Sequence, residues 1–453
     1  MKIVIEGAGE VGSHLAKMLC AEGNQVTVID NDKERLDHLS SYADVETVNG
    51  NPSSIKIQKE AGVSKADLYI AVYPFTTQEV NIVGALLAKH LGASKVIARI
   101  NDEDFLTAEN KLLFKEMGIE LMFYPEKIAA DEIVEALKHG SSEETMDFAH
   151  GKLQIAVFKL DEESPLIDLS LIDFTKMMTA EEQLNFRVIA ISRSGKTIIP
   201  KVDTKFNYND LVFTISTRDG LPLLIKYFGR KNIEIRSVMI LGGSPIGEMV
   251  ARSLSAQGFD VKIIDKSKER CLELSGRLSD KVLIVNGDGR NSDVLLEESI
   301  KDYDAFVALT GNDEANVLAC VVAKKFGLAR TIAEVENIEY MSLAEEMGVD
   351  SVINKKLITA ARIFKFTLSG KARFVKYMAG TDAELIEYTV APGSAITKGA
   401  LKDINFPRNA IIGGVVRGNE SFIAVGDTVV EPYDRVAIFA LPETIRETDK
   451  FFK

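Results

Sequence analysis

Residues 2–12 read K-I-V-I-E-G-A-G-E-V-G, an apolar run followed by three glycines in G-x-G-x-x-G spacing. The β-branched run predicts a buried strand, and the pattern from Val11 onward predicts a helix. In a strand–turn–helix unit of this kind, Gly7 permits the tight turn, Gly9 lets backbone approach a pyrophosphate, and Gly12 lets the helix pack closely on the strand. The stretch therefore predicts the first turn of a Rossmann-type doubly wound sheet.

An acidic residue stands where a dinucleotide-binding turn needs one. Asp30 ends the next predicted strand, 23 residues after Gly7. A carboxylate at this place can accept hydrogen bonds from ribose hydroxyls and disfavours a 2′-phosphate, so the pattern favours NAD(H) over NADP. Exposed N–H groups at the turn and the helix dipole would hold the phosphates. The structural alternative is a Rossmann-like domain that binds nothing.

Composition narrows the class of protein. The chain has 453 residues, of which 46% are hydrophobic and 27% are charged, as in a folded globular protein with several domains. The formal net charge of −13 argues against a nucleic-acid-binding protein, which needs a basic face. No uncharged apolar run approaches the roughly 18–20 residues of a membrane span. The charged residues Lys2 and Glu6 interrupt the apolar stretch that a signal peptide would need at the N-terminus. We therefore expect a cytosolic protein.

Cysteine and histidine spacing predicts no metal site and no catalytic cysteine. The cysteines are Cys20, Cys271 and Cys320, and they form no C-x-x-C pair. The five histidines all lie in the first third of the chain and show no metal-ligand spacing.

The chain repeats itself. A second strand-and-glycine stretch, S-V-M-I-L-G-G-S-P-I-G, occupies residues 237–247, which lie 235 positions after the first stretch. The same offset relates Asp265 to Asp30 and Asn316 to Asn81, and the ends of the two halves repeat at an offset of 224. A duplication of a whole fold-sized unit accounts for this pattern.

Four domains follow from the duplication. Each large segment alternates short β-branched runs with helical patterns, which predicts a parallel sheet with right-handed crossovers. Each small segment has hairpin-like strands and predicts a small α+β domain. The expected boundaries are 1–140 and 232–368 for the Rossmann-like domains, and 141–228 and 371–453 for the small domains.

The order of these motifs resembles that of the RCK (KTN) domains, which regulate potassium transport. The resemblance rests on the glycine turn with Asp30, on T-T-Q-E-V-N and T-G-N-D-E-A-N after the fourth strands, and on I-A-R-I at residues 97–100. The segments N-D-L-V-F and Y-D-R-V-A-I-F resemble the closing strands of the small C-terminal RCK domain. The resemblance covers nearly the whole chain and implies two Rossmann-like N-terminal domains, each followed by a small α+β C-terminal domain.

The resemblance also implies function, partners and site residues. A chain with two complete units is similar to regulatory subunits that are not enzymes and that bind NAD(H), with ATP or ADP as further ligands. Such subunits form a homo-oligomeric dimer or tetramer ring at the inner face of the cell membrane, beneath a potassium-translocating membrane protein of the Trk type. The expected cofactor-binding residues are Gly7, Ala8, Gly9, Glu10, Val11, Gly12, Asp30, Tyr73, Pro74 and Arg99 in the first unit, and Gly242, Gly243, Ser244, Pro245, Ile246, Gly247, Asp265, Asp288 and Thr310 in the second.

Two positions depart from that family's pattern. Tyr73 and Pro74 replace small hydroxylated residues after the fourth strand. Asn51 replaces the acid that usually follows the glycine after the third strand, whereas Asp288 keeps this acid in the second half.

The residues by themselves leave three functions to compare: a regulatory binding module, an NAD-dependent oxidoreductase and a structural scaffold. Hydride transfer to a carbonyl needs a substrate pocket and a proton donor beside the nicotinamide. No His, Tyr–Lys or Cys constellation accompanies the glycine turns. Two cofactor turns without a substrate domain therefore favour a sensor.

The helix expected from Pro125 onward carries an apolar stripe that includes Ile128, Ala129, Ile133 and Leu137. The related family uses this crossover helix for pairing, so we expect two copies of the chain to associate through it.

The first glycine turn is expected to be the tighter NAD(H) site. Ser244 stands where the first turn has Gly9, and Pro245 lacks the N–H that Glu10 keeps. Glu334 replaces Arg99 at the end of the fifth strand, which would repel a phosphate.

Overall fold

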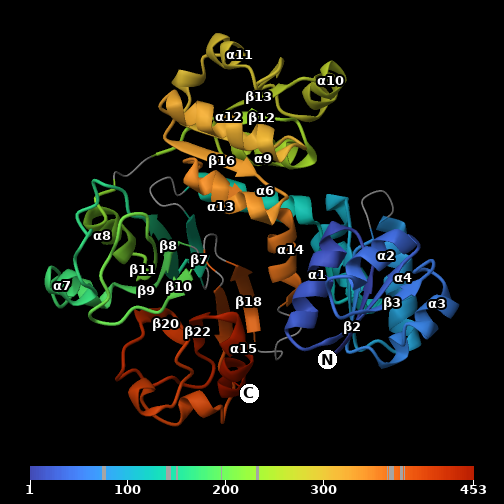
Figure 1. Ribbon diagram of the computed structural model, residues 1–453, viewed down its shortest axis with the longest axis horizontal. Coiled ribbons are helices and arrows are strands. Elements are labelled where there is room, and N and C mark those ends of the chain that lie inside the picture. Colours follow the sequence, from blue (N-terminus) through green and yellow to red (C-terminus); the bar gives the residue numbers. More distant parts are fainter. Residues whose placement is uncertain are drawn as a thin grey trace. The chain divides into compact units, whose positions relative to one another are not determined.

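The computed structural model describes residues 1–73, 78–138, 144–148, 151–194, 196–230, 234–364, 366, 372–377, 381 and 383–452 (Figure 1). It divides into two compact units, Met1–Ala129 with Lys355–Thr367 and Ala130–Asn354 with Leu368–Lys453. Of the domain breaks expected near residues 139–142, 229–232 and 369–371, only Gly229 and Arg230 lie within the described residues. Pro74 lies outside them too.

The first unit is built on a six-stranded parallel sheet in the order β3-β2-β1-β4-β5-β6. Its strands are β1 (Lys2–Glu6), β2 (Gln25–Asp30), β3 (Glu46–Asn49), β4 (Leu68–Ala71), β5 (Lys95–Arg99) and β6 (Leu121–Phe123). The helices in this part of the chain are α1 (Glu10–Ala21), α2 (Lys33–Ser40), α3 (Ile55–Glu60), α4 (Gln78–Leu91), α5 (Ala108–Glu116) and α6 (Pro125–Lys138). Glu6 pairs with Ile29 of β2 and Ala71 of β4, so these strands end together where the strand order reverses. Sheets of this kind bind ligands at that edge.

A second six-stranded parallel sheet has the order β14-β13-β12-β15-β16-β17. Its strands are β12 (Ser237–Leu241), β13 (Asp260–Asp265), β14 (Val282–Asn286), β15 (Ala305–Ala308), β16 (Arg330–Glu334) and β17 (Ser351–Ile353). The helices are α9 (Pro245–Ala256), α10 (Lys268–Arg277), α11 (Ser292–Glu297), α12 (Asp313–Lys325), α13 (Ile338–Glu346) and α14 (Lys355–Phe364). Leu241 pairs with Ile264 and Ala308, as Glu6 does with Ile29 and Ala71. The predicted duplication of a Rossmann-like domain is confirmed.

Each large sheet is followed in the sequence by a small antiparallel sheet. The strand orders of these two small sheets are β10-β9-β11-β8-β7 and β18-β19-β22-β20-β21. The first domain has β7 (Glu144–Phe148), β8 (Leu153–Lys159), α7 (Leu171–Lys176), β9 (Phe186–Arg193), β10 (Lys196–Ile198), β11 (Leu211–Thr217) and α8 (Gly220–Tyr227). The second has β18 (Ala372–Tyr377), β19 (Glu384–Thr389), β20 (Ala410–Arg417), β21 (Glu420–Ile423), β22 (Arg435–Ala440) and α15 (Pro442–Asp449). These are the small α+β domains that the sequence predicts.

The two small sheets share one apolar core. Phe213 of β11 lies against Phe439 of β22, with ring centroids 5.6 Å apart. Leu153 and Ile215 of the first domain and Leu385 of the second are buried in the same cluster. A Cβ atom on Gly414 of β20 would lie 2.7 Å from Leu153 Cδ1, so glycine there lets the two sheets approach closely.

An arginine–aspartate pair closes each small sheet in the same way. Arg193 donates from Nε and Nη2 to the two carboxylate oxygens of Asp210, each at 2.8 Å, and the N–H of Asn207 donates to the same carboxylate at 2.8 Å. Arg417 and Asp434 repeat the pair at an offset of 224. Both carboxylates are buried, so these contacts replace their hydration.

We expect Asp210→Asn to lower the free energy of unfolding of the first small domain by about 2 kcal/mol, because the amide is a weaker and less symmetrical acceptor than the carboxylate. Hydrogen exchange of the β9 and β11 amides measures this change. Asp203→Asn, which alters an exposed carboxyl nearby, should leave the exchange rates as they are. Equal protection in Asp210→Asn and the wild type would contradict the role of the pair.

The crossover helices differ from the expectation. α14 follows the second large sheet in sequence, yet it belongs to the first unit and packs against α1 (Figure 1). Within α6, Ile133, Val134 and Leu137 are buried in the single chain. The chain itself therefore covers much of this stripe, and the pairing of two copies through α6 stays a prediction.

Candidate functional site

The first glycine turn has the geometry that its glycines predict. Gly7 has a φ of +106°, and a Cβ atom on it would lie 2.7 Å from Cα of Tyr73. A Cβ atom on Gly12 would lie 1.9 Å from the carbonyl oxygen of Gly7. Gly9 precedes α1 in an extended conformation, and the helix begins at Glu10 without a side-chain cap. The turn therefore presents the N–H groups at the start of α1, which is a favourable place for an anion.

Asp30 holds this turn in place. One carboxylate oxygen accepts from the N–H of Ala8 at 2.6 Å, and the other accepts from the N–H of Asp32 at 2.8 Å. The side chain has no exposed surface. The sequence predicts that Asp30 binds ribose hydroxyls, whereas in the structure its carboxylate fastens the glycine turn to the end of β2.

The hydrophobic members of the predicted site point inward. Val11 of α1 and Ile246 of α9 are buried, so only their backbone groups can meet a ligand. Ala8 is buried too, while Glu10 is exposed and pairs with Lys356 of α14 at 3.3 Å.

Tyr73 and Arg99 are tied to protein groups. The Tyr73 hydroxyl donates to the side chain of Asn31, just after β2, and burial and the charge of Asp30 raise the pKa of its phenol. Arg99 donates to Glu126 at 3.0 Å, and both side chains are buried. The expected contact between Arg99 and a phosphate would therefore have to compete with Glu126.

An asparagine that the sequence analysis noted only as part of the repeat joins two strand ends. Asn81 of α4 accepts from the N–H of Tyr73 at 2.7 Å and donates to the carbonyl of Arg99 at 3.2 Å. Asn316 of α12 does the same between Thr310 and Glu334, at 3.0 and 2.9 Å. The sequence did contain a signal for this role, because an asparagine occurs at the same position of an otherwise apolar helix in both halves.

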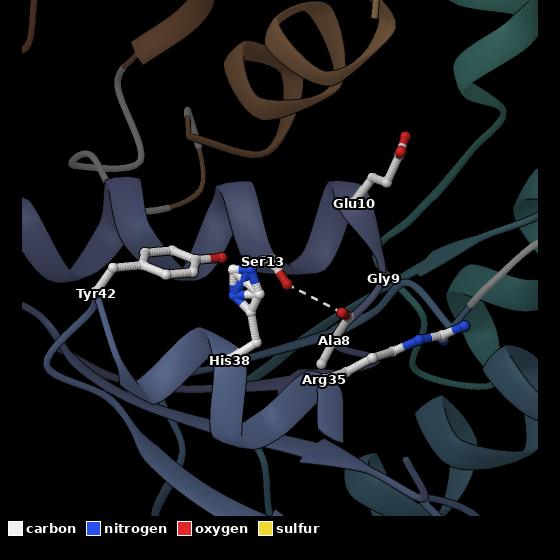
Figure 2. Close-up of a pocket in the computed structure, with 7 residues that line it drawn as sticks. All are labelled: Ala8, Gly9, Glu10, Ser13, Arg35, His38 and Tyr42. Carbon is white, nitrogen blue, oxygen red and sulfur yellow. Dashed lines mark hydrogen bonds between the residues drawn. The ribbon is translucent and has the colours of Figure 1, made fainter. Parts of the chain in front are cut away.

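Beside the first turn lies a pocket of about 420 Å³ between α1 and α2. Figure 2 shows the residues that line it, which are Ala8, Gly9, Glu10, Ser13, Arg35, His38 and Tyr42. Ser13 donates to the carbonyl of Ala8 at 3.0 Å, and Arg35 lies 3.3 Å from the carboxylate of Asp32. Ser13 and the α2 residues Arg35 and His38, together with Tyr42 just beyond α2, belong to no sequence motif and were not among the predicted site residues.

The second glycine turn keeps the backbone path of the first. Gly242 has a φ of +102°, and a Cβ atom on Gly247 would lie 2.3 Å from the carbonyl oxygen of Gly242. Asp265 accepts from the N–H of Gly243 at 2.7 Å. Ser244 differs from Gly9, because its hydroxyl caps α9 by accepting from the N–H of Gly247 at 3.2 Å.

A cluster of charges covers the second turn. Arg270 of α10 donates to the carbonyl of Gly243 at 2.6 Å and to Glu248 of α9 at 2.7 Å. Pro245 forms the first residue of α9, so one N–H is missing there. This carboxylate and this missing donor are the structural reasons for expecting the second turn to bind a pyrophosphate more weakly than the first.

The last two predicted residues of the second half lie at the ends of β14 and β15. Asp288 is half-exposed and is held by Arg290 at 2.6 Å, which lowers its pKa to about 2. The Thr310 hydroxyl donates to Asn316 at 2.6 Å.

A buried carboxyl directly precedes the first turn. Glu6 of β1 accepts from the Tyr69 hydroxyl at 2.7 Å, and Gln58 of α3 donates to the same hydroxyl at 3.2 Å. A Cβ atom on Gly84 of α4 would lie 2.1 Å from the carboxyl, so glycine leaves the room that Glu6 occupies. Burial raises the pKa of Glu6 to about 8, against the effect of the Tyr69 hydrogen bond.

Among the described residues, no group of three or more His, Cys, Asp or Glu side chains could hold a metal ion. The described helices also include none that is long and apolar enough to cross a membrane.

Family models match most of the chain. The TrkA-N domain matches residues 3–125 and 238–355, and the TrkA-C domain matches residues 155–229 and 385–453. The Trk system potassium uptake protein TrkA homolog of Archaeoglobus fulgidus is 34% identical over 100% of both chains. TrkA homolog 1 of Methanosarcina mazei is 33% identical, again over 100% of both chains.

Solved structures share the fold. The GsuK RCK domain has a TM-score of 0.61 at 15% identity and covers 99% of this chain and 94% of its own. The GsuK channel bound to NAD has a TM-score of 0.61 at 16% identity and covers 100% of this chain and 78% of its own. The chain therefore belongs to the TrkA family, with its domains in the order TrkA-N, TrkA-C, TrkA-N, TrkA-C.

Proposed function

We propose that this chain is a cytoplasmic regulatory subunit that binds NAD(H), and ATP or ADP, and controls a potassium-translocating membrane protein of the Trk type at the inner face of the cell membrane. Full-length relatives named as Trk potassium uptake proteins support the transport role. A protein of the same fold described as bound to NAD supports the ligand class.

One observation carries the nucleotide part of the proposal. The first turn holds Gly7 and Gly12 where side chains would collide with backbone, and Asp30 fixes the N–H of Ala8. A turn built in this way presents helix N–H groups to a pyrophosphate.

The test has two stages. Calorimetry with NAD⁺, NADH, ATP and ADP measures binding to the purified chain. Potassium flux into vesicles that contain the membrane partner then measures control by the chain at each nucleotide concentration. A chain that binds none of the four nucleotides, or that alters flux equally with and without them, would contradict the proposal.

An NAD-dependent oxidoreductase is the second candidate, and the Tyr73 phenol beside the turn is the observation in its favour. Its raised pKa makes it a weak proton donor at neutral pH. Steady NADH oxidation with a small carbonyl substrate, abolished by Asp30→Ala, would establish the enzyme.

Self-association is part of the proposal, now through another surface. Leu113 and Met117, at and just beyond α5, are 50% and 46% exposed, and Leu343 and Met347 repeat this pair at α13 with 51% and 40% exposure. A second copy of the chain fits this surface, because each chain offers it twice and copies can therefore join into a closed ring.

We expect the double variant Leu113→Asp, Leu343→Asp to convert an oligomer into a monomer of 49.8 kDa, because each aspartate would be buried without a partner in the interface. Light scattering measures the mass. Leu184→Asp changes a leucine that is 65% exposed in a small domain and should keep the oligomer. A wild-type monomer at micromolar concentration would refute self-association.

A further inference from the structure

The buried cluster around Glu6, directly before the first glycine turn, has more hydrogen-bond acceptors than donors. Within the described part of the chain, Glu6 Oε1 and Gln58 Oε1 are buried and accept no hydrogen bond. The Gln58 amide donates to the Tyr69 hydroxyl and to the carbonyl of Gly84, at 3.2 and 2.9 Å. A proton on the Glu6 carboxyl therefore adds a donor that this cluster otherwise lacks.

Among the described residues, no cation pairs with Glu6. The groups that face its carboxyl are Tyr69 of β4, Gln58 of α3 and Gly84 of α4. The Tyr73 phenol is a further titratable group nearby, and its pKa is raised in part by the charge of Glu6. An ionised Glu6 would therefore have to draw water or a cation into the cluster, because a buried charge without a partner is unfavourable.

The helix that closes this cluster also fastens the glycine turn. A Cβ atom on Gly84 of α4 would lie 2.1 Å from the Glu6 carboxyl, so helix and carboxyl are in close contact. One turn earlier in α4, the buried Asn81 accepts from the N–H of Tyr73 at 2.7 Å. Tyr73 borders Gly7, because a Cβ atom on Gly7 would lie 2.7 Å from its Cα. Water drawn to an ionised Glu6 would move α4 outward and loosen Asn81 from the strand end beside the turn.

The second half keeps the fastening and lacks the carboxyl. Asn316 of α12 accepts from the N–H of Thr310 at 3.0 Å, as the asparagine of α4 does at the first turn. Leu241 and Ala319 take the places of the carboxyl and of Gly84, and both are buried. The titratable group therefore belongs only to the half whose turn we expect to bind NAD(H) more tightly.

We propose that Glu6 is a pH-sensitive switch for the first glycine turn: the protonated carboxyl keeps α4 in the arrangement that binds a nucleotide, and its ionisation weakens that binding. This inference rests on the proposed nucleotide site at the turn. Because binding favours the protonated form, affinity falls as the pH rises through the pKa of Glu6, which burial raises to about 8. By linkage, NADH that binds near this pH causes the chain to take up protons.

The first test uses NADH, because none of its own groups titrates between pH 7 and pH 9.5. Calorimetry should give a dissociation constant that is about ten-fold higher at pH 9.5 than at pH 7 for the wild type. For Glu6→Gln the change should be less than two-fold. Glu60→Gln, which alters an exposed carboxyl at the end of α3, should follow the wild type. Titrations at pH 8 in two buffers of different ionisation enthalpy should show proton uptake by the wild type and none by Glu6→Gln.

Hydrogen exchange tests the switch without any nucleotide. Corrected for the intrinsic effect of pH, the protection of the Tyr73 N–H should fall about ten-fold between pH 7.5 and pH 9.5. The Thr310 N–H is the matched control in the same chain and should keep its protection. The triple variant Glu6→Leu, Gln58→Leu, Tyr69→Phe copies the residues of the second half. It should keep the protection of both amides, and it replaces Glu6→Gln if that variant does not fold.

Two results would overturn the proposal. One is a wild-type affinity for NADH that depends on pH no more than that of Glu6→Gln. The other is a Tyr73 amide whose protection stays as constant as that of Thr310. A chain that binds no NADH at pH 7 would contradict the proposed function instead, and the Tyr73 amide would still decide whether Glu6 acts on the strand end.

Discussion

Replacing Glu6 by glutamine should remove a fall of about 3 kcal/mol in the stability of the first Rossmann-like domain between pH 5 and pH 7.5. The Glu6 carboxyl is buried, and its pKa is raised from 4.5 to about 8. In the unfolded chain the carboxyl ionises above pH 4.5, while in the folded domain it stays protonated up to about pH 8. The folded state therefore binds the extra proton, and the stability it gives is lost as the pH rises through this window.

Hydrogen exchange of the β1 and β4 amides, corrected for the intrinsic effect of pH, measures this change within a chain of several domains. Glu6→Gln keeps an acceptor for the Tyr69 hydroxyl but cannot ionise, so its protection should be nearly constant over the window. Glu34→Gln alters an exposed carboxyl and should follow the wild type. A wild-type protein with constant protection between pH 5 and pH 7.5 would show that Glu6 is ionised in the folded state.

The second half supplies an apolar version of the same cluster. Leu241, Leu295 and Phe306 take the places of Glu6, Gln58 and Tyr69 and lie in the buried core. The triple variant Glu6→Leu, Gln58→Leu, Tyr69→Phe should therefore fold and lose the pH dependence, because no polar group of the cluster would remain buried.

Gly12→Ala should weaken NAD(H) binding by roughly a hundred-fold, about 2.7 kcal/mol. The added Cβ would lie 1.9 Å from the carbonyl oxygen of Gly7, so α1 or the turn must move. Since the N–H groups that face a pyrophosphate belong to that turn, a small displacement removes several hydrogen bonds at once. Calorimetry with NADH measures the loss, and thermal unfolding separates it from global destabilisation.

Gly247→Ala is the matched variant, because its Cβ would lie 2.3 Å from the carbonyl of Gly242. We expect it to leave most NAD(H) binding intact, since Glu248 and Pro245 make the second turn a poor pyrophosphate site. Asp30→Ala should likewise remove most NAD(H) binding, whereas Asp265→Ala should leave most of it. Two NAD(H) sites of equal affinity per chain, or a greater loss of binding from Gly247→Ala than from Gly12→Ala, would contradict the prediction that the first glycine turn is the tighter site.

The sequence contained most of the fold because its signals are local or repeated. The strand-and-glycine pattern at residues 2–12 and its copy at residues 237–247 predicted both parallel sheets and the duplication. The backbone demands on Gly7 and Gly12 were readable too, because a turn between a strand and a helix leaves no room for side chains.

The sequence could not show which distant group each polar side chain would bind through a hydrogen bond or an ion pair. Asp30 was expected to face ribose, and this stays a prediction, but the sequence did not show that each of its carboxylate oxygens also accepts from a backbone N–H, that of Ala8 and that of Asp32. Arg99 pairs with Glu126, and Glu6 pairs with a tyrosine 63 residues away. The α6 stripe has a visible period, but a period does not say whether another copy or the same chain covers it.

The position of α14 means that a fragment made by dividing the chain at its internal repeat would lack part of the first structural unit. A fragment that ends after the first small domain would contain every strand and glycine of the first Rossmann-like domain. It would nevertheless lack the helix that packs on α1, because residues 355–364 are encoded in the other half. The first copy of the repeated unit thus depends on a helix that the second copy encodes.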